Sequence, residues 1–328
     1  MTHHPTAPVR YFRTWRLPLG LLALLPCLLW ILGAPARAAS SPESARAEAT
    51  APIAVLDWTL AETLLALGVT PRGVAQIDAY HDWVGAPQMP DAVTDIGLRA
   101  QPNLELLAGL DLEHILISPM FSALAPRLSH IAPVETMSIY LAEGDTWSNL
   151  LATTRELARL TGRPAAAQDL IDATREHLDQ LRQRLPETSP PLLMVQFMDA
   201  RHVRVFGDNS LYQVVLERLG LDNAWTGPTN RWGFSLVALE ALAGIDAQLV
   251  VIEPLPVGVE AQLAESGLWH SLDAVRDGDV IRLAPVWSFG GLPSARRFAD
   301  LLVTALVDAS TPATTRHAAA PSAEGEHD

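Results

Sequence analysis

Three tryptophans and one arginine stand at positions where a ligand could reach them. Trp83, Trp232 and Trp287 fall in stretches rich in Gly, Pro and Asn rather than at the periodic positions of a core element. Aromatic rings on loops that a rigid scaffold holds form suitable walls for a ligand. Arg99 lies in a predicted turn just before a helix, where its guanidinium offers several fixed donors to an anionic or oxygen-rich ligand. Each residue taken singly also fits a core ring or a surface cation, but the four together indicate a binding site.

The sequence lacks the motifs of common enzymes, namely G-x-S-x-G, G-x-G-x-x-G after a strand and H-E-x-x-H. It contains no lysine, which excludes a lysine-bearing P-loop and Schiff-base chemistry. The histidines are scattered without the spacing of metal ligands. We therefore predict a protein that is not an enzyme and carries no cofactor or metal of its own; a periplasmic hydrolase with an unrecognised site is the alternative from another class.

The first 38 residues have the composition of a secretory signal peptide. Three arginines precede an apolar run at 17–33, and A-R-A at 36–38 has the small residues of a cleavage site. The run is shorter than the roughly 20 residues that a membrane span requires, so we predict cleavage and a periplasmic location. Cys27, the one cysteine, lies in this run and would be the acylated residue of a lipoprotein, but Pro26 before it fits that reading poorly.

The chain is acidic, with a formal net charge of −14. Loss of the predicted signal peptide, which holds four arginines and no acidic residue, makes the charge about −18. Such a charge disfavours nucleic acid and anionic membrane surfaces as partners. Cleavage also removes the one thiol, so disulfides, thiolate metal sites and cysteine nucleophiles are excluded from the mature chain.

A seven-residue unit occurs twice, as E-L-L-A-G-L-D at 105–111 and E-A-L-A-G-I-D at 240–246. In each copy a predicted helix ends at glycine, the chain turns at aspartate, and an apolar run of strand type follows, at 115–117 and at 249–252. Two similar halves predict two α/β lobes, and a cleft between lobes is a favoured place for a small ligand. Chance recurrence of a helix, a glycine and a strand is the alternative.

A long helix is predicted between the two copies, because residues 164–185 have no Gly or Pro after Pro164 and repeat apolar residues at helical spacing. Its length of about 33 Å suits either a connector between lobes or an ordinary packing helix. Shorter helices are predicted from about Thr59, which could cap the first of them, from Asp145 or Thr146, and after Ser210. The predicted organisation is a signal peptide at 1–38, a flexible leader at 39–52, an N-terminal lobe at 53–163, a connecting helix at 164–186, a C-terminal lobe at 187–309 and a disordered tail at 310–328.

Five segments carry a resemblance to a known family: E-T-L-L-A-L-G-V at 62–69, D-I-G-L-R-A-Q-P-N-L-E-L-L at 95–107, R-H-V-R-V-F-G-D-N-S-L at 201–211, N-A-W-T-G-P-T-N-R-W-G at 223–233 and A-P-V-W at 284–287. With them the chain resembles the FhuD-type periplasmic ferric-hydroxamate siderophore-binding proteins of bacterial ABC importers, from Ile53 to about Asp308. The resemblance implies a class III fold with a helical backbone, in which two α/β lobes flank a ligand cleft and a single long helix bridges them with little hinge closure.

The resemblance also implies partners and residue roles. It places Arg99 at the iron-bound hydroxamate oxygens of an Fe(III)-hydroxamate siderophore and the three loop tryptophans around the body of that ligand. Glu105 and Glu240, one in each copy of the repeated unit, would dock arginines of an inner-membrane permease that works with an ATPase. The protein itself would be a monomer, and the iron would arrive already caged by its chelator.

Two departures from the family concern the ligand. Phe121 and Phe289 stand where better-known members have tyrosines, so a hydroxyl expected near the hydroxamate oxygens is missing. Loss of one hydrogen bond costs roughly 0.5 to 1.5 kcal/mol, up to about tenfold in affinity. A different hydroxamate, or another chelate such as cobalamin, haem or a catecholate siderophore, is therefore the alternative ligand.

Overall fold

The computed structural model describes residues 51–140 and 145–310, which fall within one compact unit of the chain, Arg46–Asp328. The predicted signal peptide with Cys27, and the tail after residue 310, lie outside the described residues. The prediction of a flexible leader up to residue 52 is wrong at its end, because the first strand already begins at Ala51. None of the helices in the described ranges is long and apolar enough to span a membrane.

The first lobe contains the following elements: β1 (Ala51–Val55), α1 (Trp58–Ala66), β2 (Pro71–Val74), α2 (Ile77–Val84), β3 (Thr94–Asp95), β4 (Gly97–Leu98), β5 (Gln101–Pro102), α3 (Leu104–Ala108), β6 (His114–Ile117), the 3₁₀ helix η1 (Pro119–Leu124), α4 (Ala125–Leu128), β7 (Val134–Thr136) and α5 (Thr146–Leu160). Its sheet has the order β3-β2-β1-β6-β7 and all its pairings are parallel. The central strands β1 and β6 are mostly buried apolar runs because helices cover both faces of a parallel sheet.

The second lobe follows the connecting helix and contains the remaining elements: β8 (Leu192–Phe197), β9 (His202–Phe206), α7 (Leu211–Leu219), β10 (Phe234–Ala238), the 3₁₀ helix η2 (Leu239–Leu242), β11 (Gln248–Ile252), α8 (Val259–Ala264), α9 (Gly267–Ser271), α10 (Asp273–Arg276), β12 (Val280–Leu283) and α11 (Leu292–Ser310). Its sheet has the order β10-β9-β8-β11-β12. The strands β8, β11 and β12 are parallel, whereas β9 pairs antiparallel with β8 and β10, so β8 and β9 form a hairpin that turns at 198–201.

The repeated unit of the sequence has a structural counterpart in both lobes. The strands that follow the two copies, β6 and β11, each hold the fourth place in the order of their sheets. The helical part differs, since the first copy forms α3 and the second forms the tighter η2. The backbone becomes left-handed at Gly244 in the second copy, with φ of 77°, but at Asp111 in the first, with φ of 46°.

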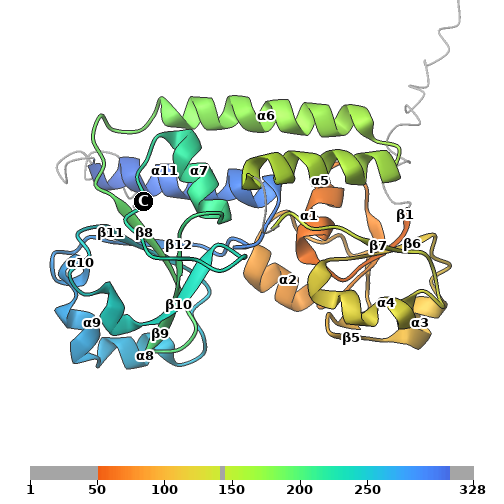
Figure 1. Ribbon diagram of the computed structural model, residues 1–328, viewed down its shortest axis with the longest axis horizontal. Coiled ribbons are helices and arrows are strands. Elements are labelled where there is room, and N and C mark those ends of the chain that lie inside the picture. The colour runs from red at the N-terminus through yellow and green to blue at the C-terminus, as the bar shows by residue number, and fades with distance from the viewer. Residues whose placement is uncertain (1–50, 141–144, 311–328) are drawn as a thin grey trace, which may run out of the picture. The chain divides into compact units, whose positions relative to one another are not determined.

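The connecting helix α6 (Pro164–Arg182) extends along the upper edge of the view in Figure 1 and packs against α5, α7 and α11. Its buried face is apolar apart from Thr174, whose hydroxyl donates to the carbonyl of Leu170 at 2.7 Å and so needs no partner outside the helix. The helix ends at Arg182, three residues before the predicted end at Leu185, because the chain then continues in tight turns. The predicted architecture of two α/β lobes bridged by a long helix is confirmed.

Helix starts were predicted with mixed success. The predicted starts near Asp145 or Thr146 and after Ser210 are confirmed, since Asp145 caps α5 and Ser210 caps α7. The prediction that Thr59 caps α1 is wrong, since the cap is Asp57, whose Oδ1 accepts a hydrogen bond of 2.9 Å from the backbone N–H of Thr59. Aspartate is the better cap because its carboxylate also complements the positive end of the helix. This shift leaves the hydroxyl of Thr59 available for other contacts.

Candidate ligand site between the lobes

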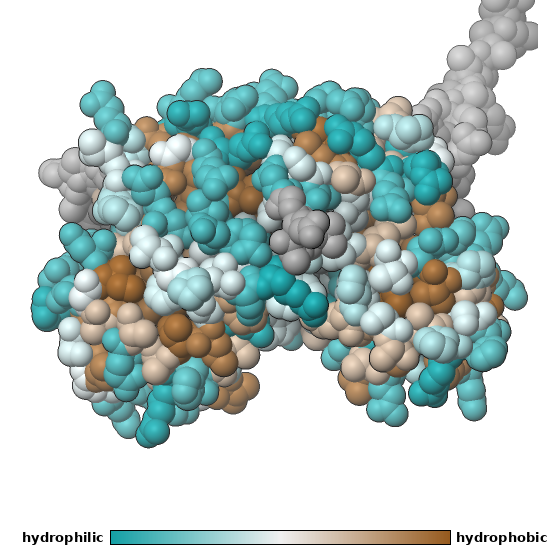
Figure 2. Space-filling view, in the orientation of Figure 1, coloured by the Kyte–Doolittle hydropathy of each residue, from teal (hydrophilic) through white to brown (hydrophobic). Residues whose placement is uncertain are grey.

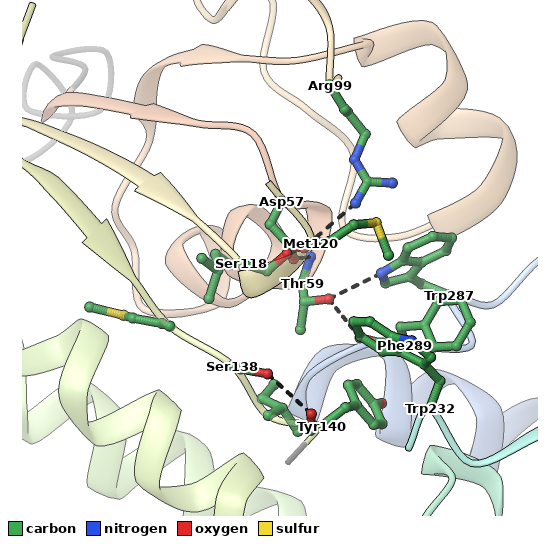
Figure 3. Close-up of a pocket in the computed structure, with 13 residues that line it drawn as sticks. Asp57, Thr59, Arg99, Ser118, Met120, Ser138, Tyr140, Trp232, Trp287 and Phe289 are labelled. Atoms are coloured by element: carbon green, nitrogen blue, oxygen red, sulfur yellow. Dashed lines mark hydrogen bonds and ion pairs between the residues drawn. The ribbon is translucent and has the colours of Figure 1, made fainter. Parts of the chain in front are cut away.

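A pocket of about 380 Å³ lies between the two lobes, and Figure 3 shows its walls. It is lined by residues from both halves of the chain: Asp57, Thr59, Leu60, Arg99, Ser118, Met120, Met137, Ser138, Ile139, Tyr140, Trp232, Trp287 and Phe289. The space-filling view in Figure 2 shows hydrophobic surface on both lobes flanking the recess between them. Large apolar side chains are accordingly exposed on each lobe: Leu98 and Met120 on the first, Met198 and Leu236 on the second.

Arg99 stands at the first-lobe side of the pocket, in the turn between β4 and β5 (Figure 3). Its Nε donates to the carbonyl of Leu56 at 3.0 Å, and its Nη2 lies 3.5 Å from Oδ2 of Asp57. Burial lowers the pKa of the guanidinium, while Asp57 acts in the opposite direction and keeps it charged. The remaining Nη hydrogens are free to donate to a ligand, since a guanidinium has five.

The guanidinium of Arg99 is held between aromatic rings. Its carbon lies 4.3 Å from the ring centroid of Trp58, 5.0 Å from that of Phe121 and 5.4 Å from that of Trp287. Such stacking fixes the plane of the cation while leaving its edge available for hydrogen bonds. Phe121 therefore supports Arg99 but is not among the residues that line the pocket.

Thr59 ties the floor of the pocket to the segment of the second lobe that carries the aromatic residues. Its hydroxyl donates to the carbonyl of Phe289 at 2.6 Å and accepts from Nε1 of Trp287 at 3.1 Å. Both partners are more than 225 residues away along the chain, so this contact joins the two lobes at the site (Figure 3). Neither Thr59 nor Asp57 was predicted as a site residue.

The second-lobe wall is a cluster of rings that meet edge to face. Trp287 and Phe289 have centroids 5.3 Å apart, and Phe289 and Trp232 have centroids 5.8 Å apart. Tyr140 closes the cluster at 6.0 Å from Phe289, and its hydroxyl donates to the carbonyl of Gly290 at 3.1 Å. Burial raises the pKa of the Tyr140 hydroxyl well above its ordinary value, so this group acts as a neutral donor. The wall is therefore apolar, rigid and shared between distant segments.

Two serine hydroxyls at the pocket differ in their hydrogen bonding. Ser138 donates to the carbonyl of Tyr140 at 3.3 Å. The hydroxyl of Ser118 is buried and has no hydrogen-bond partner within residues 51–140 and 145–310. A buried hydroxyl without a partner costs free energy unless a ligand or water satisfies it. Ser118 follows β6 directly, and no motif in the sequence pointed to it.

Behind the pocket, a buried carboxyl group links α1 to the start of α11. Glu62 accepts hydrogen bonds from the backbone N–H of Gly291 and, at 2.6 Å, from the hydroxyl of Ser294. Burial raises its pKa to about 8, although these two donors act against the shift. The glycines at 290 and 291 are required here, because a Cβ at Gly290 would overlap the side chain of Ser294 and a Cβ at Gly291 would lie 2.6 Å from the hydroxyl of Thr63. Glu62 therefore belongs to the support of the site rather than to its wall.

The structure brings together four of the residues predicted from the sequence, since Arg99, Trp232, Trp287 and Phe289 all line the pocket. Trp83 lies elsewhere: it is half-buried on α2 and packs against the core of the first lobe. The prediction that it stands in an irregular loop is wrong, because residues 77–84 form a helix with Tyr80 and Val84 on its buried face.

The glutamates of the repeated unit lie outside the pocket. Glu105 is exposed in the first turn of α3, and Glu240 is exposed in the first turn of η2. Neither forms an ion pair with another described residue. In the same ranges no three His, Cys, Asp or Glu side chains gather into a possible metal site.

Comparison with known proteins places this site in a family. A model of the family described as periplasmic binding proteins matches residues 53–286. The iron(3+)-hydroxamate-binding protein FhuD of Escherichia coli is 33% identical over 294 residues, which cover 88% of this chain and 95% of that protein. Both matches span the two lobes and the helix between them.

Solved structures have the same fold. The Fe³⁺–Desferal-bound siderophore-binding protein FhuD from Vibrio cholerae is similar with a TM-score of 0.74 and 30% identity, covering 79% of this chain and 98% of that one. The triscatecholate siderophore-binding protein FeuA from Bacillus subtilis shares the fold with a TM-score of 0.65 at 20% identity, covering 79% of this chain and 93% of that one. The resemblance predicted from the sequence is confirmed, and this chain belongs to the periplasmic binding protein family.

Proposed function

We propose that this protein is the substrate-binding component of an ABC importer, which captures an Fe(III)-hydroxamate siderophore and delivers it to an inner-membrane permease. The observation that carries the proposal is the position of Arg99, a charged donor at the floor of a pocket whose walls are aromatic and come from both lobes. The two FhuD relatives, at 33% and 30% identity over most of their length, support the same ligand class.

The chemistry of the ligand suits these residues. In a ferric tris-hydroxamate the three monoanionic chelating groups cancel the charge of the metal, yet their oxygens remain strong hydrogen-bond acceptors. Arg99 donates to these oxygens, and the unpartnered hydroxyl of Ser118 offers a further donor in the same pocket. Trp232, Trp287 and Phe289 cover the organic part of the chelator by apolar contact. Such a ligand needs no metal-binding side chains, because its iron is already fully coordinated.

The remaining roles follow from the proposed function. The protein acts as a monomeric carrier without enzymatic activity, is exported by its cleaved signal peptide, and works in the periplasm. Residues 51–163 and 187–310 form the two lobes, and 164–186, which include helix α6, form the connection. The exposed Glu105 and Glu240 on the two lobes meet arginines of the permease, while Phe121 supports Arg99 from the first lobe.

Titration of the intrinsic tryptophan fluorescence tests the proposal, because Trp232 and Trp287 line the pocket. We expect saturable quenching of the mature protein by a ferric trihydroxamate such as ferric desferrioxamine B. Arg99→Ala should weaken that binding by about tenfold or more, since it removes a charge-assisted hydrogen bond. Arg127→Ala, at an exposed arginine of α4, is the matched control.

The controls also cover the other ligand classes. Ferric enterobactin, cobalamin, haem and free Fe(III) are titrated in parallel with correction for their absorbance. Saturation by one of these and none by any hydroxamate would reject the proposed ligand while leaving the family assignment intact. Unchanged affinity in Arg99→Ala would reject the role of this arginine.

A further inference from the structure

A second arginine faces the same aromatic cluster from the other lobe. Arg204 lies on β9 between Val203 and Val205, which point into the core on the opposite face of the sheet. Its guanidinium carbon lies 4.9 Å from the ring centroid of Phe234 and 5.7 Å from that of Phe289. Phe289 lines the pocket, so Arg204 adjoins the ligand site from the second lobe.

Arg204 differs from Arg99 in having no anionic partner. No carboxylate of the described residues lies within 4.0 Å of its guanidinium, whereas Arg99 has Asp57 at 3.5 Å. The one side-chain hydrogen bond of Arg204 is a long one, 3.4 Å from Nη1 to Oε1 of Gln196. Burial lowers the pKa of this guanidinium, which reflects the cost of holding a partly buried cation without a counter-charge.

The partner of Arg204 is itself a group with spare donors. The side chain of Gln196 is almost fully buried, and its Oε1 accepts from both Arg204 and the hydroxyl of Ser288. These two donors fix the orientation of the amide, which leaves Nε2 without an acceptor within the described part of the chain. Gln196 thus anchors one end of the Arg204 guanidinium, whose other N–H groups have no acceptor among residues 51–140 and 145–310 and suit a negatively charged or carboxylate oxygen.

The surroundings of Arg204 are open to a ligand. Its direct neighbour across β10 is Leu236, which is 60% exposed, and Met198, two residues beyond Gln196, is 40% exposed. Arg231 stands over the ring of Trp232 at 4.9 Å and adds another exposed cation at the same wall. Arg99 is the one arginine in the lining of the pocket, which also includes one carboxylate, Asp57, whereas Arg204 and Arg231 stand over the pocket rings Phe289 and Trp232.

We infer that Arg204 forms a second, anion-selective subsite, and that the preferred ligands are Fe(III)-hydroxamate chelates that carry a free carboxylate. This inference rests on the proposed function and narrows its substrate class. Arg99 binds the hydroxamate oxygens around the metal, and Arg204 binds the carboxylate on the second-lobe side. The two cations are linked by successive ring contacts, 5.4 Å from Arg99 to Trp287, 5.3 Å from Trp287 to Phe289 and 5.7 Å from Phe289 to Arg204.

A matched pair of ligands separates the carboxylate from the rest of the chelate. Desferrioxamine B is acylated at its terminal amine either with an acetyl group, which gives a neutral ferric complex, or with a succinyl group, which ends in a carboxylate. We expect the wild-type protein to bind the succinyl complex about five- to tenfold more tightly, as a partly exposed ion pair allows. This preference should shrink as the sodium chloride concentration rises.

Two substitutions then assign the preference to one residue. Arg204→Met keeps the length and the contact with the phenylalanine rings but removes the charge, so we expect it to abolish the preference and to leave the affinity for the acetyl complex within about twofold. Arg204→Lys keeps the charge and should retain part of the preference. Arg201→Met, at an exposed arginine of the same hairpin, is the control and should bind as the wild type does.

The outcomes distinguish this inference from the proposed function. If both complexes bind with equal affinity to the wild-type protein, or if the preference persists in Arg204→Met, the subsite is rejected and the proposed function stands. Equal weakening of both complexes by Arg204→Met would also reject it, because Arg204 would then act only as part of the wall. If neither complex binds to the wild-type protein, the proposed function fails. Circular dichroism of each variant checks that the substitution has not unfolded the protein.

Discussion

At the residue scale, Thr59 shows how one hydroxyl can organise a binding site. It lies at the start of α1 with its backbone N–H bonded to Asp57, and its side chain bridges to Trp287 and Phe289. Each of these partners lines the pocket. The position of the second-lobe aromatic wall relative to Arg99 therefore depends on Thr59, an uncharged residue that belongs to no recognised sequence motif.

We expect Thr59→Val to lower the free energy of unfolding by about 1 to 3 kcal/mol, because Nε1 of Trp287 and the carbonyl of Phe289 each lose a buried partner. The affinity for a ferric hydroxamate should fall as well, since the wall is less firmly held. Urea denaturation followed by far-UV circular dichroism measures the first effect. Thr59→Ser retains the hydroxyl and is the control. An equal loss of unfolding free energy in Thr59→Val and Thr59→Ser would contradict the role of this hydroxyl.

At the scale of elements, the two lobes are joined by the contact between α1 and the beginning of α11. Glu62 on α1 is fully buried and accepts from Gly291 and Ser294, which belong to the turn and first residues of α11. Asp57, the N-cap of the same helix, also raises the pKa of Glu62, and Glu62 in turn raises the pKa values of Tyr80 on α2 and Tyr140 after β7. These neighbours are acidic groups, and no cation among the described residues offsets the burial of this carboxyl.

The protonation of Glu62 should make stability depend on pH. Its pKa in the folded protein is about 8, against an ordinary value of 4.5, so the folded state binds a proton that the unfolded chain releases between these values. The free energy of unfolding therefore falls as the pH rises from about 5 to about 9. Thermal unfolding at a series of pH values measures this slope.

Glu62→Gln mimics the neutral acid, so we expect the variant to lose most of that slope and to be more stable than the wild type at about pH 9. Glu240→Gln, at an exposed glutamate in the second lobe, should unfold as the wild type does at every pH. If the stability of Glu62→Gln and of the wild-type protein changes with pH by the same amount, a group other than Glu62 causes the pH dependence.

At the scale of the whole molecule, the two lobes share their cores. Trp147 and Leu150 of α5, which follows the first sheet, pack in the cluster that contains Phe298 of α11. Conversely, Trp287 from the second half packs with the core of the first lobe. A large hinge motion of the lobes would have to separate these buried side chains, so we expect little closure on ligand binding.

We expect the double variant Glu105→Arg and Glu240→Arg to bind the ferric chelate within about twofold of the wild type, because both residues lie outside the pocket. In the proposed docking, stimulation of the ATPase of the reconstituted importer should fall by about tenfold or more, because like charges would then face arginines of the permease. Glu156→Arg, at an exposed position on α5, is the control. Unaltered stimulation by the double variant would contradict the docking role.

The sequence by itself determined the two-lobed α/β architecture, the connecting helix, and Arg99, Trp232 and Trp287 as pocket residues. These features depend on local patterns: apolar runs that form buried strands, glycines that end helices, and irregular segments rich in Gly, Pro and Asn that hold a ring or a guanidinium. Trp83 misled the prediction because the polar residues around it hide a short helix with only two buried positions, Tyr80 and Val84.

The tertiary structure alone decided which side chains meet across the lobes. Thr59, Tyr140 and Glu62 act through partners at 287–294, which lie about 150 residues or more away along the chain. Hydrogen bonds of this kind leave no periodicity or spacing in the sequence, because each depends on how the two lobes pack against each other. The same holds for Arg204, a strand residue between two valines whose role depends on Phe289 and Gln196 standing on the same face of the sheet.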